Sequence, residues 1–220
     1  PAAIRACCED SLGRMRVDHI DIYQLHWPNR GSYHFRKNWH YEPTLFRRDR
    51  AIEDMTACLG ELGRLKAEGK IGAFGLSNET AWGMAQWLRL AELGAGPRAV
   101  SLQNEYSLMC RLYDTDLAEL GAVEGVMLLA YSPLAAGLLT GKYRGGQVPE
   151  GSRRSATPDL GGRTTERAEA AVDAYLQIAA DAGLDPAAMA SAWILTRPFP
   201  VLPIIGASTM AQLDIALSAA

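Results

Sequence analysis

The sequence has few residues of the types that build disulfide frameworks or metal sites. Its 220 residues include 4 cysteines and 4 histidines. No C-x-x-C or H-E-x-x-H pattern joins them, so neither a disulfide scaffold nor a zinc site is expected. We therefore predict that the protein binds no metal. Because unpaired cysteines are typical of a reducing compartment, we also predict a cytoplasmic protein.

An excess of positive charge and long hydrophobic runs are missing too. Lys and Arg number 22 against 25 Asp and Glu, which gives a formal net charge of -3. A dedicated nucleic-acid binder needs a basic surface, so nucleic acid is not expected as a partner. The longest apolar stretches, 126–131 and 201–205, are far shorter than the ~18 residues that cross a bilayer, so no membrane span is expected.

The first residues of the chain contain no initiator methionine and no signal-peptide pattern. Residues 1–5 have the composition of a helix interior, and we expect the chain to be truncated at its N-terminus. Hydrophobic residues make up 48% of the sequence, which is ordinary for a globular protein. At ~150 residues per domain the length allows one or two domains, and we predict a single domain over residues 1–220.

Hydrophobic patterning predicts a regular alternation of helices and strands. Short apolar segments bounded by turn residues predict five strands, at 19–25, 71–76, 99–103, 126–131 and 201–205. Helical periodicity predicts helices at 4–16, 51–69, 80–93, 114–121, 164–183, 185–196 and 209–219. Such alternation is typical of parallel strands joined by helices, either in a closed (β/α)₈ barrel or in an open doubly wound sheet. A barrel would require three more strands than these five.

Two segments fall outside this alternation. Residues 28–50 mix five aromatic side chains with several Arg and Lys residues, a composition that suits either single-stranded RNA or a substrate loop at a barrel mouth. The acidic overall charge favours the substrate loop. Residues 145–162 are rich in Gly, Pro, Ser and Arg, and they predict a mobile loop over a binding site.

Two glycine motifs resemble nucleotide-binding signatures but lack the required context. Residues 94–99 match G-x-G-x-x-A, yet they follow a predicted helix and precede a strand, so we interpret them as a helix end. Residues 137–143 are one residue short of a P-loop and lack its magnesium-binding Ser or Thr. The lysine of this second motif, Lys142, could still contact a phosphate group.

Polar residues follow all five predicted strands, where parallel α/β proteins build their sites. Taken singly, Ser77 with Asn78, or Ser208 with Thr209, would be helix caps, and His26 would be a half-buried histidine. Taken together, they suit a pyridine nucleotide. The amides of Asn78 and Gln103 can pair with a carboxamide, and the ring of Tyr131 can stack on a heteroaromatic ring.

The last strand end and the first one complete this pocket. Gly206, just before a predicted helix, offers backbone N–H groups to a phosphate. His26 can hydrogen-bond a carbonyl oxygen that gains negative charge during hydride transfer.

These residues lie in longer motifs that resemble the aldo-keto reductase family, in particular its bacterial branch similar to potassium-channel beta subunits. The motifs match in order and spacing over nearly the whole chain. They are residues 11–28 with Tyr23-Gln24-Leu25-His26-Trp27-Pro28, residues 69–78 ending in Ser77-Asn78, Gln103-Asn104-x-Tyr106-Ser107, residues 130–143 with Ala130-Tyr131-Ser132-Pro133-Leu134, and Pro203-x-x-Gly206-Ala207-Ser208. The resemblance implies an NADPH-dependent (β/α)₈ TIM barrel, incomplete here with about five of its eight βα units. Such an enzyme reduces small-molecule aldehydes or ketones by hydride transfer.

The resemblance also implies roles for individual residues. His26 matches the catalytic histidine that orients the substrate carbonyl. Ser77, Asn78 and Gln103 match carboxamide contacts, and Tyr131 matches the platform under the nicotinamide. The remaining matched residues would hold the phosphates and the adenosine end of the cofactor: Ser132, Pro133, Leu134, Gly137, Lys142, Arg153, Gly206, Ser208 and Gln212.

The sequence departs from the family pattern at three places. The family's proton donor is a tyrosine assisted by a lysine and an aspartate on the first barrel strands, and those segments are not among these 220 residues. Ile215 and Ala216 stand where polar residues usually contact adenine, and the family's C-terminal tail is not present. The alternative function is a non-catalytic NADP(H)-binding regulatory protein like the channel beta subunits, which do not keep a histidine at the position of His26.

Overall fold

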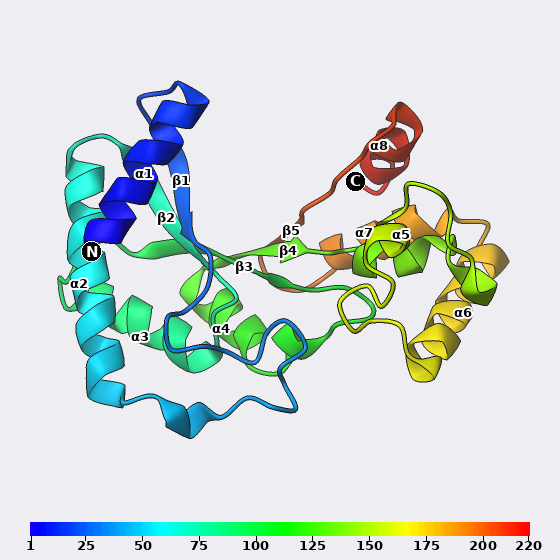
Figure 1. The fold of residues 1–220 in the computed structure, drawn as a ribbon, viewed down its shortest axis with the longest axis horizontal. Helices are drawn as coiled ribbons and strands as arrows, with labels where there is room; N and C mark the ends of the chain where they lie inside the picture. Colours follow the sequence, from blue (N-terminus) through cyan, green and yellow to red (C-terminus); the bar gives the residue numbers. More distant parts are fainter. The chain divides into compact units, whose positions relative to one another are not determined.

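The structure, a computed structural model, describes residues 1–220 and contains five strands that alternate with helices (Figure 1). The strands are β1 (Ile20–Leu25), β2 (Ile71–Ser77), β3 (Ala99–Glu105), β4 (Met127–Tyr131) and β5 (Val201–Pro203). Their order in the sheet is β1-β2-β3-β4-β5. The pairs β1–β2, β2–β3 and β4–β5 are parallel. The prediction of a parallel α/β fold, with five strands of an incomplete barrel, is confirmed.

Helices occupy the segments between the strands, close to their predicted positions. They are α1 (Ala2–Met15), α2 (Arg48–Ala67), α3 (Ala81–Glu92), α4 (Leu117–Glu124), α5 (Arg153–Ala156), α6 (Glu166–Asp181), α7 (Pro186–Leu195) and α8 (Met210–Leu217). None of them is both long and apolar enough to cross a membrane. Side-chain hydrogen bonds cap the N-termini of several of these helices. The hydroxyls of Thr80, Thr165 and Thr209 each accept a hydrogen bond from a backbone N–H in the first turn of α3, α6 and α8.

Several predicted boundaries were wrong. Helix α2 begins at Arg48 rather than at residue 51, with Asp49 in its first turn, where a carboxylate favours the helix dipole. The predicted loop 28–50 is therefore shorter, and it also contains a 3₁₀ turn at Pro43–Leu45. Residues 112–114 form a 3₁₀ turn, so α4 starts at Leu117 instead of residue 114. Strand β3 extends two residues beyond its predicted end, and β5 stops two residues before it.

The chain divides into two compact units, which are described separately. Unit 1 comprises residues 1–103 and 123–127, and unit 2 comprises residues 104–122 and 128–220. The predicted single domain over residues 1–220 stays a prediction. In unit 1, Leu59, Leu62 and Leu65 form the buried face of α2, and Phe74 of β2 is fully buried as well. Spacings of three residues place these leucines on one side of the helix, as the sequence pattern predicts.

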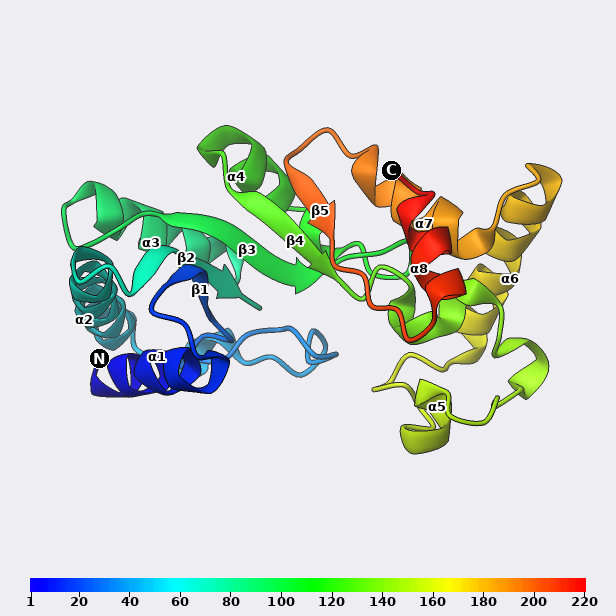
Figure 2. The same ribbon diagram turned by 90° about the horizontal axis from the view of Figure 1, so that it is seen from above.

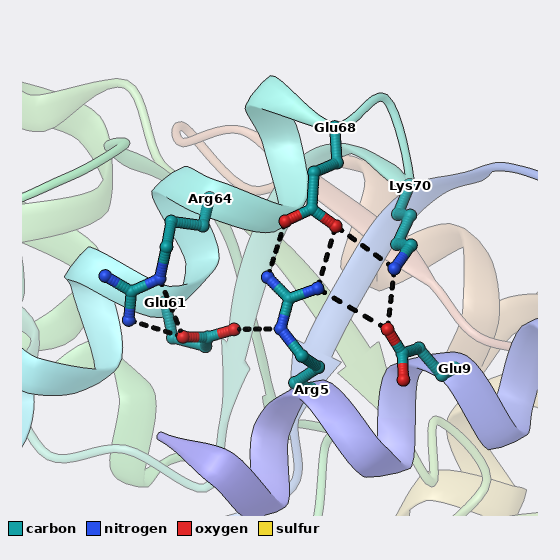
Figure 3. A network of polar contacts seen from close by, with 6 residues as sticks. All are labelled: Arg5, Glu9, Glu61, Arg64, Glu68 and Lys70. Atoms are coloured by element: carbon teal, nitrogen blue, oxygen red, sulfur yellow. Dashed lines mark hydrogen bonds and ion pairs between the residues drawn. The ribbon is translucent and has the colours of Figure 1, made fainter.

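A network of charged residues joins α1 to α2 within unit 1 (Figure 3). Arg5 of α1 donates hydrogen bonds to the carboxylates of Glu61 (2.6 Å) and Glu68 (2.6 and 2.7 Å). Lys70, after α2, bonds Glu9 of α1 at 2.6 Å. Arg64 extends the network through Glu61. The network fixes α1 against the C-terminal half of α2.

The loop after β1 packs its first arginine into unit 1. The Arg30 side chain is 7% exposed and forms an ion pair with Glu79, which is 2% exposed. Its guanidinium carbon lies 5.7 Å from the ring centre of Phe46 and 5.1 Å from that of Trp82. Arg30 is thus committed to contacts inside the protein. This cation does not contribute to the basic surface that single-stranded RNA would require.

Unit 2 is built around the β4–β5 pair, whose strands run side by side in Figure 2. Its apolar core contains Leu138, Leu139, Tyr143, Leu160 and Val172, all buried. A second cluster stacks Tyr106 on Trp193 of α7, with ring centres 5.3 Å apart. The guanidinium groups of Arg111 and Arg197 lie 4.6 and 4.4 Å from the Trp193 ring centre.

Candidate functional site

The predicted site residues belong to both units. In unit 1, the carboxyl ends of β2 and β3 are joined by hydrogen bonds. The Asn78 backbone N–H donates to the Gln103 carbonyl at 3.0 Å. The Ser77 hydroxyl donates to the same carbonyl at 2.7 Å. Ser77, Asn78 and Gln103, predicted as the carboxamide contacts, therefore form one connected group.

The Asn78 side chain extends this group to β1. Its amide nitrogen donates to the backbone carbonyl of His26 at 2.9 Å and to the Ser77 hydroxyl at 3.0 Å. The Asn78 backbone has a φ of 55°, in the left-handed region that asparagine tolerates better than most residues. Such strained positions cluster at functional sites. Helix α3 starts after Thr80, so Ser77 and Asn78 are not its caps.

His26 lies just after β1, with its ring stacked on Trp27 at a centre-to-centre distance of 4.7 Å. It lines a cleft of about 390 Å³ in unit 1, together with Gln24 and Ser77. Tyr23 also lines this cleft. Burial raises the pKa of Tyr23, which makes its hydroxyl an even weaker acid at neutral pH.

Unit 2 contains a second cleft, of about 560 Å³, at the ends of β4 and β5. Most of the residues predicted to hold phosphates and adenosine line it: Ser132, Pro133, Leu134, Gly137, Lys142, Arg153, Gly206 and Gln212. Ile215 and Ala216, the two apolar residues that depart from the family pattern, line it too. Tyr131, the last residue of β4, and Ser208 are not among the lining residues.

The segment after β4 forms a tight turn beside this cleft. Ser132, Ala136 and Gly137 all have positive φ, of 55°, 60° and 97°. A Cβ atom on Gly137 would lie 2.9 Å from Cε of Lys142, so only glycine lets the lysine side chain lie against the turn. The Lys142 ammonium is 5.1 Å from the ring centre of Tyr143. The turn thus holds a cation at the cleft wall.

Two elements bring further groups to the same cleft. Arg153 is the first residue of α5, in the segment predicted as a mobile loop. Three residues after the end of β5, a Cβ on Gly206 would meet no atom within 4 Å, so the space beside its Cα is open. Ser208 donates through its backbone N–H (2.9 Å) and its hydroxyl (3.1 Å) to the Gln212 amide oxygen. Ser208 and Gln212 therefore contact each other directly.

The sequence analysis missed part of the cleft wall, which is formed by the start of α7. Asp185 caps α7 by accepting from the N–H groups of Ala187 (2.8 Å) and Ala188 (3.0 Å). Asp185, Pro186 and the buried Ser191 line the cleft, as does Thr140. The Asp-Pro pair marks the helix start, which the sequence pattern placed at residue 185, but it does not indicate that this start borders a cleft.

The donor set of this cleft suits a phosphorylated dinucleotide. Lys142 and Arg153 supply two cations, and Gly206, which also lines the cleft, has open space where a Cβ would stand. Phosphate groups are bound by such cations and by backbone N–H groups that point into open space. In unit 1, the Ser77, Asn78 and Gln103 group supplies the donors and acceptors that a carboxamide needs.

Comparisons with known proteins show which family the chain resembles. A family model described as "Aldo/keto reductase family" matches residues 1–220. Protein tas of Escherichia coli (strain K12) is 42% identical over 210 residues, covering 96% of this chain and 60% of its own length. An aldo-keto reductase of Babesia bovis is 36% identical over 221 residues, which are 93% of this chain and 75% of that protein.

Among solved structures, the glycerol dehydrogenase AKR11B4 from Gluconobacter oxydans superimposes with a TM-score of 0.72 at 29% identity. The match covers 100% of this chain and 59% of that protein. The chain therefore spans about 60% of the length of the first relatives it matches.

Proposed function

Because this chain belongs to the aldo/keto reductase family, an oxidoreductase family, we propose that the protein reduces aldehydes or ketones to alcohols with NADPH as its cofactor. The observation that carries this proposal is the unit 2 cleft, which gathers Lys142, Arg153 and Gly206 from three separate segments. The pyrophosphate common to NADH and NADPH can pair with one of these cations, which leaves the other for the additional phosphate that NADPH carries.

NADPH, when bound, supplies the hydride for such a reduction. Ser132 and Gly206 would bind its phosphates through backbone groups, and Lys142 and Arg153 through their charges. Gly137, whose N–H donates to the Leu134 carbonyl, would line the phosphate site without donating to it. Ser77, Asn78 and Gln103 would orient the carboxamide, and Tyr131 would support the ring. These residues bind and orient, and they take no part in proton transfer.

His26 would act on the substrate. Its imidazole can donate a hydrogen bond to the carbonyl oxygen, which gains negative charge as the carbonyl carbon is reduced. Its ring is stacked on that of Trp27. We assign the proton that completes the alcohol to none of the residues of this chain.

The proposal is tested by following NADPH oxidation by the native protein with a panel of aldehydes and ketones. We expect turnover with at least one carbonyl class. A His26→Ala variant should lose ~100-fold or more in kcat, because one hydrogen-bond donor to the developing oxyanion is removed, and it should keep its affinity for NADPH. His40→Ala, in the exposed part of the loop after β1, is the matched control and should behave like the wild type.

Three results would contradict the proposal. The absence of NADPH binding would refute the cofactor assignment. An unchanged kcat in His26→Ala would refute the role of the histidine, and NADPH binding without turnover of any carbonyl would favour a regulatory function.

A further inference from the structure

The ammonium group of Lys142, one of the two cations in the unit 2 cleft, is paired with no carboxylate and with no other acceptor of the protein. Its charge is therefore available to a phosphate group. A lysine side chain is flexible, however, and it loses conformational entropy when a ligand fixes its ammonium group. Binding is stronger where the protein already holds the side chain in place.

The turn after β4 fixes the backbone of Lys142. The Thr140 hydroxyl donates a hydrogen bond to the Gly137 carbonyl at 2.9 Å and accepts one from the Lys142 backbone N–H at 3.4 Å. Between them, Gly141 has a φ of 77°, in the left-handed region that glycine adopts without strain. The turn thus determines where the Lys142 side chain begins.

The Lys142 side chain itself lies against a glycine and an aromatic ring. A Cβ on Gly137 would be 2.9 Å from Cε of Lys142, so the lysine stem runs directly beside this glycine. The ammonium nitrogen is 5.1 Å from the ring centre of Tyr143, within the ~6 Å at which an aromatic ring attracts a cation. The same Cβ would be 3.3 Å from Cε2 of Tyr143, so glycine, lysine and ring meet at one place.

The Tyr143 ring is a rigid partner. It is 4% exposed and packs in the apolar core of unit 2 with Leu138, Leu139 and Val172. Because the core holds the ring, the ring does not move with the lysine. An aromatic ring also attracts an ammonium group without neutralising its charge, as a carboxylate would. Lys142 is thus held and remains a full cation.

We propose that Tyr143 is a positioning residue whose ring holds the Lys142 ammonium group at the cleft wall, where it pairs with a phosphate of the cofactor. This inference rests on the proposed function, in which Lys142 binds a phosphate through its charge. Tyr143 is not among the residues that line the cleft, so it acts through the lysine. It reduces the entropy that Lys142 loses when the phosphate binds.

Three substitutions separate this role from simple packing. Tyr143→Phe keeps the ring and loses only the hydroxyl, which accepts a 3.4 Å hydrogen bond from the Arg154 backbone N–H. Tyr143→Leu keeps an apolar side chain in the core and removes the ring. Lys142→Met keeps a side chain of similar length and removes the ammonium group. Combining Tyr143→Leu with Lys142→Met completes a double-mutant cycle.

The first measurement is the Kd for NADPH of the native protein and these variants, by cofactor fluorescence. We expect Tyr143→Leu to raise the Kd about three- to tenfold, which is the effect of one side chain that must be immobilised on binding. Tyr143→Phe should stay within about twofold of the wild type, because the ring attracts the cation in both. In the Lys142→Met background, Tyr143→Leu should change the Kd no further.

The second measurement needs no cofactor and no variant of Tyr143. The chain has only four lysines, at positions 37, 66, 70 and 142, and Lys142 is the one that lies over a ring. After reductive methylation with ¹³C-formaldehyde, the methyl signal that disappears in Lys142→Met is assigned to Lys142. We expect the ring current of Tyr143 to shift this signal upfield of those of the exposed Lys37 and Lys66.

Two results would overturn the inference. One is an equal rise of the Kd on Tyr143→Leu with and without Lys142, because Tyr143 would then act by packing alone. The other is a Lys142 methyl signal without an upfield shift, which decides the question even if Tyr143→Leu does not fold. Failure of the wild type to bind NADPH would instead overturn the proposed function, so the two failures are distinguishable.

Discussion

Two adjacent arginines, Arg153 and Arg154, face different surroundings. Arg153 lines the unit 2 cleft, whereas Arg154 bonds the backbone carbonyl of Tyr143 at 3.4 Å and lies 5.9 Å from its ring centre. We expect Arg153→Ala to weaken NADPH binding by ~10-fold or more, because a charge-assisted hydrogen bond to phosphate is lost. NADH binding should change much less.

Fluorescence titration with both cofactors measures this difference. Arg154→Ala serves as the matched control, and any effect it has should be the same for NADPH and NADH. An equal loss of both cofactors in Arg153→Ala would exclude a role of Arg153 at the additional phosphate.

The buried pair of Arg30 and Glu79 concerns stability instead. Glu79 accepts hydrogen bonds from Arg30 (3.1 Å), from the Thr80 N–H (2.6 Å) and from the Trp87 indole (3.2 Å). Glu79→Ala leaves the Arg30 charge buried without its partner, which should cost about 3–5 kcal/mol of unfolding free energy. Urea denaturation measures this free energy.

The control is Asp10→Ala, which breaks the exposed ion pair with Arg14 and should leave the unfolding free energy nearly unchanged. A similar loss of unfolding free energy in both variants would contradict the prediction.

Single residues also show which features of the site the sequence can predict and which it cannot. Polar residues at strand ends were found because the carboxyl ends of parallel strands meet at one edge, so a one-dimensional pattern determines a three-dimensional neighbourhood. No such sequence pattern indicates the left-handed backbone conformation of Ala136 or the close approach of Lys142 to Gly137. The hydrogen bond from the Gln24 side-chain amide to that of Gln103 could not be predicted from the sequence either, because it depends on the strand register.

At the scale of elements, the α1–α2 network predicts that the stability of the fold falls at low pH. Hydrogen bonds from Arg5, and then from Lys70, lower the pKa of Glu68 from 4.5 to about 2. The carboxylate therefore stabilises the fold fully above about pH 4.5, and this stabilisation is lost as the pH falls toward about 2. Glu68→Gln should unfold at a lower temperature than the wild type at pH 6, and the gap should narrow at pH 3.

Thermal unfolding at both pH values measures the gap. Because the network is solvent-accessible, the gap at pH 6 should also shrink in ~1 M salt. A gap that stays constant or widens in acid would show that Glu68 contributes by packing rather than by charge.

Elements were predictable in proportion to their length and periodicity. Helix α2 has leucines at three-residue steps and was found, but its start was placed three residues late because Arg48, Asp49 and Arg50 contribute nothing to an apolar pattern. Helix α5 has only four residues, too few for periodicity, so its segment was interpreted as a loop. The 3₁₀ turn at residues 135–140 depends on positive φ angles at alanine, which local propensity does not indicate.

At the scale of the whole molecule, the strand order places β1 and β5 at the two ends of the sheet. Such edges present unpaired backbone groups to other chains. Ile22 of β1 is 45% exposed and Leu202 of β5 is 52% exposed. We expect the 220-residue chain, expressed on its own, to associate increasingly with concentration.

Size-exclusion chromatography with light scattering measures this association. Ile22→Lys should reduce it, because a charge on an edge strand opposes pairing. Val123→Lys, on α4 and also exposed, should not. A single species of 23.9 kDa at every concentration would contradict the expectation.

The setting of Trp193 makes the molecule its own optical probe. Of the chain's 5 tryptophans, Trp27, Trp39, Trp82 and Trp87 lie in unit 1, and Trp193 alone lies in unit 2. Its indole is flanked by two guanidinium groups, and α7, which carries it, also lines the cleft of that unit. With the other four replaced by phenylalanine, the emission of this one residue would report the unfolding of unit 2 without any added dye.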